Sequence, residues 1–236
     1  MDDAVQRAFR AIRSLEVPDD ELSEPFRQAI PIGGVSVSSF GAIGTNETIS
    51  ASDDTASRVD EIQFDLTEGP CWTALRRRAP VLEGDIIRHP NTEWPAFNDA
   101  VRGEAVRAVF AFPIVFGPFP LGAVDVYATE PTELDDEQVE FGSALATAMG
   151  RRVLRRVVRA VEDEDALLDR NPFSRRVVHQ ATGVVLAQLD ITPDDATLLI
   201  QGHAFARRTS MRQVAEEIIS GVVRFEQHGG LIEDVR

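Results

Sequence analysis

The chain has no lysine, one cysteine and one tyrosine among its 236 residues. Because the single Cys71 has no partner for an internal disulfide, we expect a reducing compartment, the cytoplasm. No apolar run approaches the ~20 residues of a membrane-spanning helix. The start, Met1-Asp2-Asp3, is acidic, whereas a secretory signal is basic and then apolar. These absences predict a cytoplasmic protein without a membrane partner.

Catalytic motifs are also missing. We find no Walker loop, no G-x-G-x-x-G after a strand and no H-E-x-x-H. The four histidines are not paired at the spacing of metal ligands; they are His89, His179, His203 and His228. We therefore expect no catalytic residue, no bound metal and no cofactor.

Acidic residues dominate the charge, but unevenly. The formal net charge is −15, and residues 1–150 contain 11 Arg against 26 acidic residues. Residues 151–236 contain 13 of each kind. Since a negative surface repels anionic partners, contact with nucleic acid is expected only in the last third of the chain.

Hydrophobic periodicity predicts an α+β fold with one central antiparallel sheet. Alternating or continuous apolar stretches indicate strands, and apolar residues three to four apart indicate helices. The expected strands are 35–40, 47–51, 80–82, 106–115 and 121–127, and the expected short helices are 4–15, 24–29, 71–78 and 96–102.

One long amphipathic helix is expected from Asp135 to Leu168. Its apolar stripe, from Phe141 to Val161, is longer than one sheet can cover, so we expect it to connect two domains and to pair with a second copy. Five arginines, Arg151, Arg152, Arg155, Arg156 and Arg159, lie close together there. They indicate either a phosphate-binding strip or, as we favour, a solvated face.

Three compact helices are expected after Asn171-Pro172. Ser174, Thr192 and Ser210 are typical N-cap residues, and Thr192 is followed by proline and two acids. The third helix is expected to reach Val223, and the tail after Gln227 is expected to be loose. The sequence thus predicts a small helical bundle.

Cys71 has two interpretations. It follows Glu68-Gly69-Pro70 at the start of a short predicted helix, where the helix N-terminus favours a reactive thiolate and hence a redox or ligand-binding role. The alternative, a small buried core residue, is favoured because the nearest cations lie more than a helical turn away.

Several motifs resemble known families. The runs His179–Leu189, Thr192–Ala196, His203–Ala206 and Val214–Ile219 resemble the ANTAR domain, a three-helix bundle of bacterial RNA-binding antitermination regulators. Upstream, the motifs Thr67–Cys71, Pro80-Val81, Trp94–Phe97, Ala108–Pro113 and Leu121–Tyr127 resemble the GAF sensor domain that is fused to ANTAR in actinobacteria.

The resemblance implies a four-part organisation. It consists of an N-terminal helix (1–24), a GAF-like sensor domain (25–134), a long linker and dimerisation helix (135–170) and an ANTAR-like RNA-binding domain (171–228). The implied function is transcription antitermination by a homodimer. In that role, the bundle binds paired RNA hairpins near the transcript start, and the GAF-like domain senses an unknown small molecule. Two alternatives stay open: a protein-interaction module and a thiol-redox sensor, both without RNA binding.

Residues 170–212 hold six Arg against three acidic residues, a local net charge of +3 within a strongly acidic chain. Contacts to RNA phosphates and base edges are expected from nine residues. These residues are Arg175, Arg176, Gln180, Thr182, Gln188, His203, Arg207, Arg208 and Arg212. Phe205 either stacks on a base or belongs to the core. Many ANTAR domains have Lys at Thr182, and members with GAF domains commonly have Arg near Leu199 and Gln201 and Ala at Gly202. These departures predict weak or strongly salt-dependent binding.

Overall fold

A computed structural model describes residues 3–14, 16–30, 32–40, 46–162, 175–228 and 231–235. The chain divides into two units, Met1–Phe173 and Ser174–Arg236. Each unit has its own hydrophobic core, so each is described by itself.

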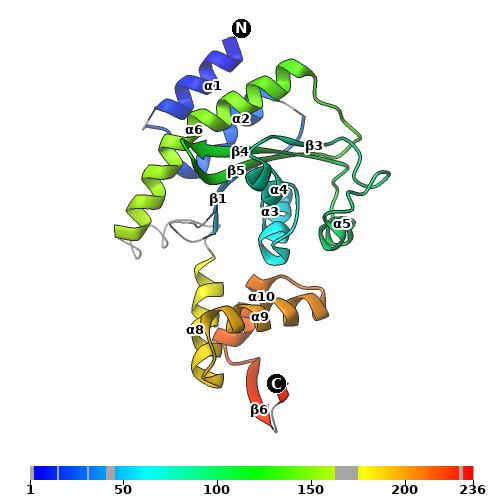
Figure 1. Cartoon of the computed structure of the whole chain (residues 1–236), viewed down its shortest axis with the longest axis vertical. Coiled ribbons are helices and arrows are strands. Elements are labelled where there is room, and N and C mark those ends of the chain that lie inside the picture. The colour runs from blue at the N-terminus through cyan, green and yellow to red at the C-terminus, as the bar shows by residue number, and fades with distance from the viewer. Residues whose placement is uncertain are drawn as a thin grey trace. The chain divides into compact units, whose positions relative to one another are not determined.

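The first unit is built on a five-stranded antiparallel sheet (Figure 1). Its strands are β1 (Val35–Ser39), β2 (Glu47–Ala51), β3 (Val81–Glu83), β4 (Ala108–Phe116) and β5 (Phe119–Ala128), in the order β2-β1-β5-β4-β3. The predicted α+β class and antiparallel sheet are therefore confirmed. The central strands β4 and β5 are buried on both faces, which explains their nearly continuous apolar sequences.

Helices cover both faces of this sheet (Figure 1). One face packs against α2 (Ser23–Ala29) and α6 (Asp136–Glu162), and α1 (Asp3–Arg13) packs on these two helices. A 3₁₀ turn, η1 (Asp19–Glu21), lies beside β2. The other face packs against α3 (Asp54–Leu66) and α4 (Pro70–Arg77), with α5 (Pro95–Val101) against α3. Side chains alternate between these layers, so Phe110 and Phe112 face α6 while Val109 and Ala111 face α3 and α4.

The structure corrects the expectation for the long helix. The described part of α6 ends at Glu162, and the predicted continuation to Leu168 lies outside the described residues. Leu145, Met149 and Val153 are fully buried in the core of the first unit itself. The sheet, together with α1 and α2, covers the stripe from Leu145 to Val157. This part of the stripe therefore gives no reason to expect a partner helix.

Two of the arginines on α6, Arg152 and Arg156, belong neither to a phosphate-binding strip nor to a solvated face. Arg152 donates to Asp19 (Nε–Oδ1 2.8 Å) and to the backbone carbonyl of Ser14 (2.8 Å). Arg156 donates to Glu47 (Nε–Oε1 2.9 Å) and also pairs with Asp19. Both guanidinium groups are buried, because they join α6 to η1 and to β2. Arg151, Arg155 and Arg159 are exposed.

Helix α3 was not predicted. Its N-terminus is capped by Asp53, whose carboxylate accepts from the backbone N–H of Ala56 at 2.8 Å. Val59 and Ile62 face the core, but buried polar residues, among them Asp60 and Gln63, alternate with them. These buried polar residues hide the apolar periodicity that identifies a helix in sequence.

The second unit contains the predicted bundle and an additional hairpin. Its helices are α8 (Arg176–Leu189), α9 (Pro193–Arg207) and α10 (Met211–Ile219). The caps at Thr192 and Ser210 are confirmed, and Ser174 lies outside the described residues. The third helix ends earlier than predicted.

The loose tail was a wrong prediction. The strands β6 (Arg224–His228) and β7 (Leu231–Val235) form an antiparallel hairpin, and β6 packs on α8 through the buried Phe225. Residues of alternating polarity on either side of Gly229-Gly230 were the sequence signal for it.

Candidate nucleic-acid interface and sensor cavity

Four of the predicted RNA-binding side chains are engaged within the second unit. Thr182 is buried, and its hydroxyl donates to the backbone carbonyl of Val178 at 2.9 Å. The Gln188 side-chain oxygen accepts from the backbone N–H of Phe225 at 3.2 Å. A side chain that is engaged in this way is a poorer candidate for direct base readout than an exposed one.

His203 and Arg207 form the second engaged pair. The His203 ring packs edge-on against Phe225, with the ring centroids 5.5 Å apart. Arg207 donates to Glu217 (Nη2–Oε1 3.0 Å), and its Nη1 lies 3.2 Å from Nε2 of His203. The Glu217 carboxylate neutralises this arginine, which reduces its attraction for phosphate.

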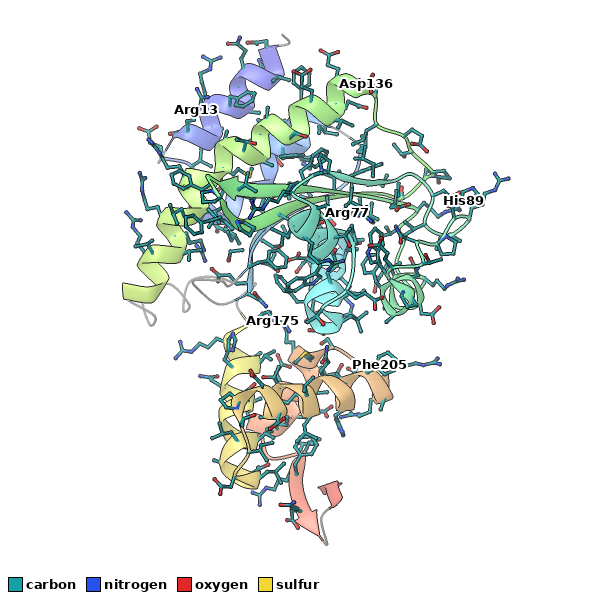
Figure 2. The ribbon with its side chains drawn as sticks, in the orientation of Figure 1. Arg13, Arg77, His89, Asp136, Arg175 and Phe205 are labelled. Carbon is teal, nitrogen blue, oxygen red and sulfur yellow. The ribbon has the colours of Figure 1, made fainter. Side chains whose placement is uncertain are left out.

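The remaining predicted residues fall into two groups. Arg175, Arg176 and Arg212 are half-buried, and each interacts with a neighbouring part of the protein. Arg175 lies at the N-terminal end of α8 (Figure 2), where its guanidinium contacts the Met211 sulfur at 3.7 Å. Gln180 on α8 and Arg208 at the end of α9 are exposed. The structure thus brings only part of the predicted set to the surface.

An exposed apolar face on α9 was not predicted as a site. Leu198 and Phe205 are 60% and 64% exposed, so Phe205 (Figure 2) is not a core residue. Together with Gly202 they are spaced four and three residues apart, which places them on one side of the helix. A Cβ added at Gly202 would meet nothing within 4 Å, so the middle of this face is open. Two large exposed apolar side chains on one side of a helix make this face a candidate binding surface.

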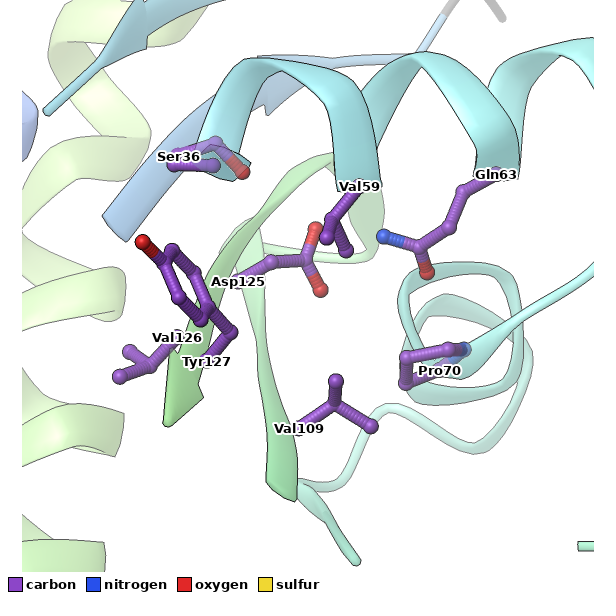
Figure 3. A pocket seen from close by; sticks show the side chains of 9 residues that line it. Ser36, Val59, Gln63, Pro70, Val109, Asp125, Val126 and Tyr127 are labelled. Atoms are coloured by element: carbon purple, nitrogen blue, oxygen red, sulfur yellow. The ribbon is translucent and has the colours of Figure 1, made fainter. Parts of the chain in front are cut away.

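The first unit contains a small cavity between α3, α4 and β5 (Figure 3). Its volume is about 10 Å³, which is room for about one water molecule. Asp125 of β5 enters it and is only 6% exposed. Among the residues that the structure describes, neither carboxylate oxygen of Asp125 has a hydrogen-bond partner. Burial and the nearby Asp60 carboxylate raise the pKa of Asp125 well above its usual range, and the side-chain amide of Gln63 acts in the opposite direction.

Gln63 of α3 faces Asp125 across this cavity (Figure 3). Its side-chain oxygen accepts from the backbone N–H of Cys71 at 2.8 Å, so its amide nitrogen points inward. That nitrogen also has no hydrogen-bond partner within the described ranges. Asp60, by contrast, accepts from the hydroxyls of Ser38 (2.6 Å) and Thr48. The unpartnered groups that face this cavity therefore belong to the Asp125–Gln63 pair.

The same local geometry accounts for Cys71. The residue is fully buried at the start of α4, and burial raises the pKa of its thiol well above the ordinary value. The neighbouring Asp125 and Asp60 carboxylates add to this rise. A buried thiol of raised pKa is less reactive than an exposed one, which favours the core interpretation over the redox hypothesis.

Two further features that would indicate a function are a metal site and a membrane-spanning helix. No group of three or more His, Cys, Asp or Glu side chains within the described ranges is arranged to hold a metal ion. Among the helices of the described chain, none combines the length and apolar character that crossing a membrane requires.

Solved structures of similar fold include GAF domains. The chain resembles in fold the GAF domain of an Acinetobacter phosphoenolpyruvate-protein phosphotransferase, with 13% identity, a TM-score of 0.50 and coverage of 68% of this chain and 93% of that one. A GAF domain of the same enzyme from Coxiella burnetii gives 14% identity, a TM-score of 0.49 and coverage of 68% and 99%. No curated protein matches the chain.

Family models identify both units. The model described as GAF domain matches residues 18–153, and the model described as ANTAR domain matches residues 168–219. The GAF match includes the sheet and the helices around the cavity, and the ANTAR match includes α8, α9 and α10. The chain belongs to the GAF domain family, and its GAF domain is followed by an ANTAR domain.

Proposed function

We propose that this chain is a non-catalytic cytoplasmic regulator that binds RNA hairpins near the start of a transcript and prevents transcription termination. In this proposal the ANTAR domain contacts the RNA, and the GAF domain responds to a small molecule. The family assignment supports both roles, because GAF and ANTAR are regulatory domains.

The observation that carries the proposal is the exposed face of α9, formed by Leu198, Gly202 and Phe205. Unpaired bases in RNA loops stack on exposed aromatic rings, and Phe205 offers such a ring. Arg208 follows three residues later and is also exposed, so it can reach a phosphate. Because the GAF domain is acidic, electrostatic repulsion favours contact at the ANTAR domain alone.

A homodimer belongs to the proposal. One ANTAR domain presents few exposed cations, so a single hairpin is expected to bind weakly. Two copies facing two linked hairpins would multiply the affinity, since the second contact becomes intramolecular. Paired hairpins are therefore the expected target.

Replacing Phe205 by Ala is expected to weaken binding to a tandem hexaloop RNA hairpin about tenfold, because base stacking on the ring disappears. The slope of log Kd against log salt concentration should stay unchanged, since no charge is removed. Arg208→Ala should instead reduce the magnitude of that slope by about 0.7–0.9 for each phosphate that is no longer neutralised. Fluorescence anisotropy with labelled RNA, scanned against salt, measures both quantities.

Phe119→Ala is the matched control, because Phe119 is an exposed aromatic residue of the GAF domain (54% exposed). It should leave RNA binding unchanged. Absence of RNA binding by the wild-type dimer at low salt would contradict the proposal. Salt-insensitive capture of an apolar peptide helix by the Leu198–Phe205 face would instead favour the protein-interaction function.

A further inference from the structure

The side of α6 that faces away from the core, its outer face, carries charges in a definite order. Residues three or four apart lie on one side of a helix, and at this spacing two acids are followed by two small residues and then by two arginines. The outer face consists of Asp136, Glu140, Ala144, Thr147, Arg151 and Arg155. All six are exposed except the half-buried Ala144. One half of this face is therefore negative and the other half positive.

The charges of the outer face have no opposite charge within reach. In the part of the chain that the structure describes, the ion pairs of α6 are those of Arg152 and Arg156, which lie on the buried side. Glu140 and Arg151 are separated by about 16 Å along the helix axis, which is too far for an ion pair. Like charges four residues apart, as in Arg151 and Arg155, repel each other and destabilise the helix.

The helix dipole accounts for only part of this order. It favours acids in the first turn and cations in the last turn, and its effect falls off within that turn. Asp136 begins α6 (Figure 2), but Glu140 follows more than one turn later. Arg151 and Arg155 precede the described end of the helix by more than one turn. These three charges therefore need an explanation outside the helix itself.

We propose that the outer face of α6 binds the same face of a second copy of this chain, with the two helices antiparallel. Glu140 then lies opposite Arg151 of the second copy. Asp136 lies opposite Arg155 of the second copy. Because the interface is two-fold symmetric, each of these ion pairs forms twice. The second copy thus supplies an opposite charge for every charge of the outer face.

The spacing of the outer face suits this symmetry. The two-fold axis passes between Ala144 and Thr147, and the intervals from there to the charged residues are the same in both directions along the helix. Ala144 and Thr147 have small side chains, so the two helix axes can approach closely where they meet. In a parallel pair, by contrast, each charged residue would face its own copy, and like charges would meet at every position.

The alternation of charge also selects a second copy over other partners. Nucleic acid would be attracted by Arg151 and Arg155 but repelled by the two acids on the same face. A basic partner would meet the reverse conflict. Since exposed ion pairs are individually weak and are screened by salt, we expect a weak dimer whose Kd depends on ionic strength.

This inference rests on the homodimer of the proposed function, and it is tested first without RNA. Sedimentation equilibrium of the full chain measures the dimer Kd, which should rise at least about tenfold between about 50 and about 500 mM NaCl. Arg151→Glu places two acids opposite each other at both ends of the interface. It should raise the Kd at low salt by at least about tenfold.

A charge reversal within one chain tests the antiparallel orientation. Arg151→Glu combined with Glu140→Arg restores opposite charges across an antiparallel interface, so its Kd should return to within about threefold of wild type. In a parallel dimer the same exchange restores nothing, because position 151 faces position 151. The matched control is Arg78→Glu, which makes the same change of charge at an exposed arginine after α4, on the other face of the sheet, and should leave the Kd unchanged.

Three results would overturn the interface. They are a wild-type chain that stays monomeric at low salt and high protein concentration, a Kd of Arg151→Glu no higher than that of Arg78→Glu, and a double variant as weak as Arg151→Glu. With RNA, Arg151→Glu should weaken binding of tandem hairpins and leave binding of a single hairpin unchanged. Loss of the interface with intact RNA binding refutes the interface alone. The expected dimer without RNA binding refutes the antitermination function and leaves the interface standing.

Discussion

Replacing Arg156 by Ala should lower the free energy of unfolding of the GAF domain by about 3–5 kcal/mol. The guanidinium of Arg156 and the carboxylate of Glu47 are 8% and 7% exposed, and they lie 2.9 Å apart. Without the arginine, the Glu47 carboxylate remains in a site shielded from water with its principal counter-charge removed. An uncompensated buried charge of this kind is among the largest single-residue destabilisations known.

Urea unfolding followed by tryptophan fluorescence measures this effect for one domain alone, because both tryptophans, Trp72 and Trp94, lie in the GAF domain. Arg155→Ala removes the neighbouring exposed arginine and should change stability little. The double variant Arg156→Met with Glu47→Leu should recover most of the loss, since no buried charge remains. If Arg156→Ala lost no more unfolding free energy than Arg155→Ala, the buried pair of Arg156 and Glu47 would not stabilise the GAF domain.

Replacing Asp125 by Asn is expected to stabilise the GAF domain increasingly as pH rises, by about 1–3 kcal/mol at pH 8. The folded state raises the pKa of Asp125, so the unfolded chain gives up this proton at lower pH than the folded chain does. Wild-type stability from this group is therefore fully present below the unfolded pKa and is lost as pH rises through the folded value. Asparagine does not ionise, so the stability of the Asp125→Asn variant does not fall with pH through this position.

The quantity to measure is the difference in unfolding free energy between Asp125→Asn and wild type at several pH values from 4 to 8. It should be near zero at pH 4 and grow with pH. The other titratable groups near Asp125 are Asp60, Cys71 and Tyr127, and the raised pKa values of Cys71 and Tyr127 keep both protonated in this range. A difference that is constant or falls with pH would show that Asp125 is ionised in the folded protein throughout.

Sequence periodicity was enough to predict most elements but not what their faces contact. The apolar stripe of α6 is plain in the sequence, yet the sequence does not say that α1 and α2 supply the missing cover. Arg152 and Arg156 are indistinguishable by type from Arg151 and Arg155. Their burial depends on Asp19 and Glu47, which are more than a hundred residues away in sequence.

The predicted RNA contacts likewise show that residue type alone does not reveal what a side chain contacts. Residue type favoured Gln188, His203 and Arg207, but a hairpin that was not foreseen, and the Glu217 carboxylate, engage them. Phe205 was ambiguous in sequence because an aromatic residue in a helix is usually buried. Only the packing of α9 on its neighbours decides which of its two apolar sides faces outward.

The cavity was beyond sequence analysis for a different reason. Asp125 stands in an apolar strand, where an alternating pattern is compatible with a solvent-exposed acid. What makes it unusual is that α3 lies over it, and α3 was the helix that the sequence did not reveal. The burial of the Asp125 carboxyl depends on the three-dimensional packing of α3 over β5, so no sequence motif identifies it.

The ion pairs of α6 also bear on how the protein is made. They connect Arg152 and Arg156 to residues 133 and 109 positions earlier, so they cannot form until the ribosome has released nearly the entire GAF domain. Until then, the apolar face of β4, with Phe110, Phe112 and Ile114, has no α6 to cover it. A nascent chain halted before this helix emerges therefore exposes this apolar face to aggregation, and release of α6 is the step that covers it.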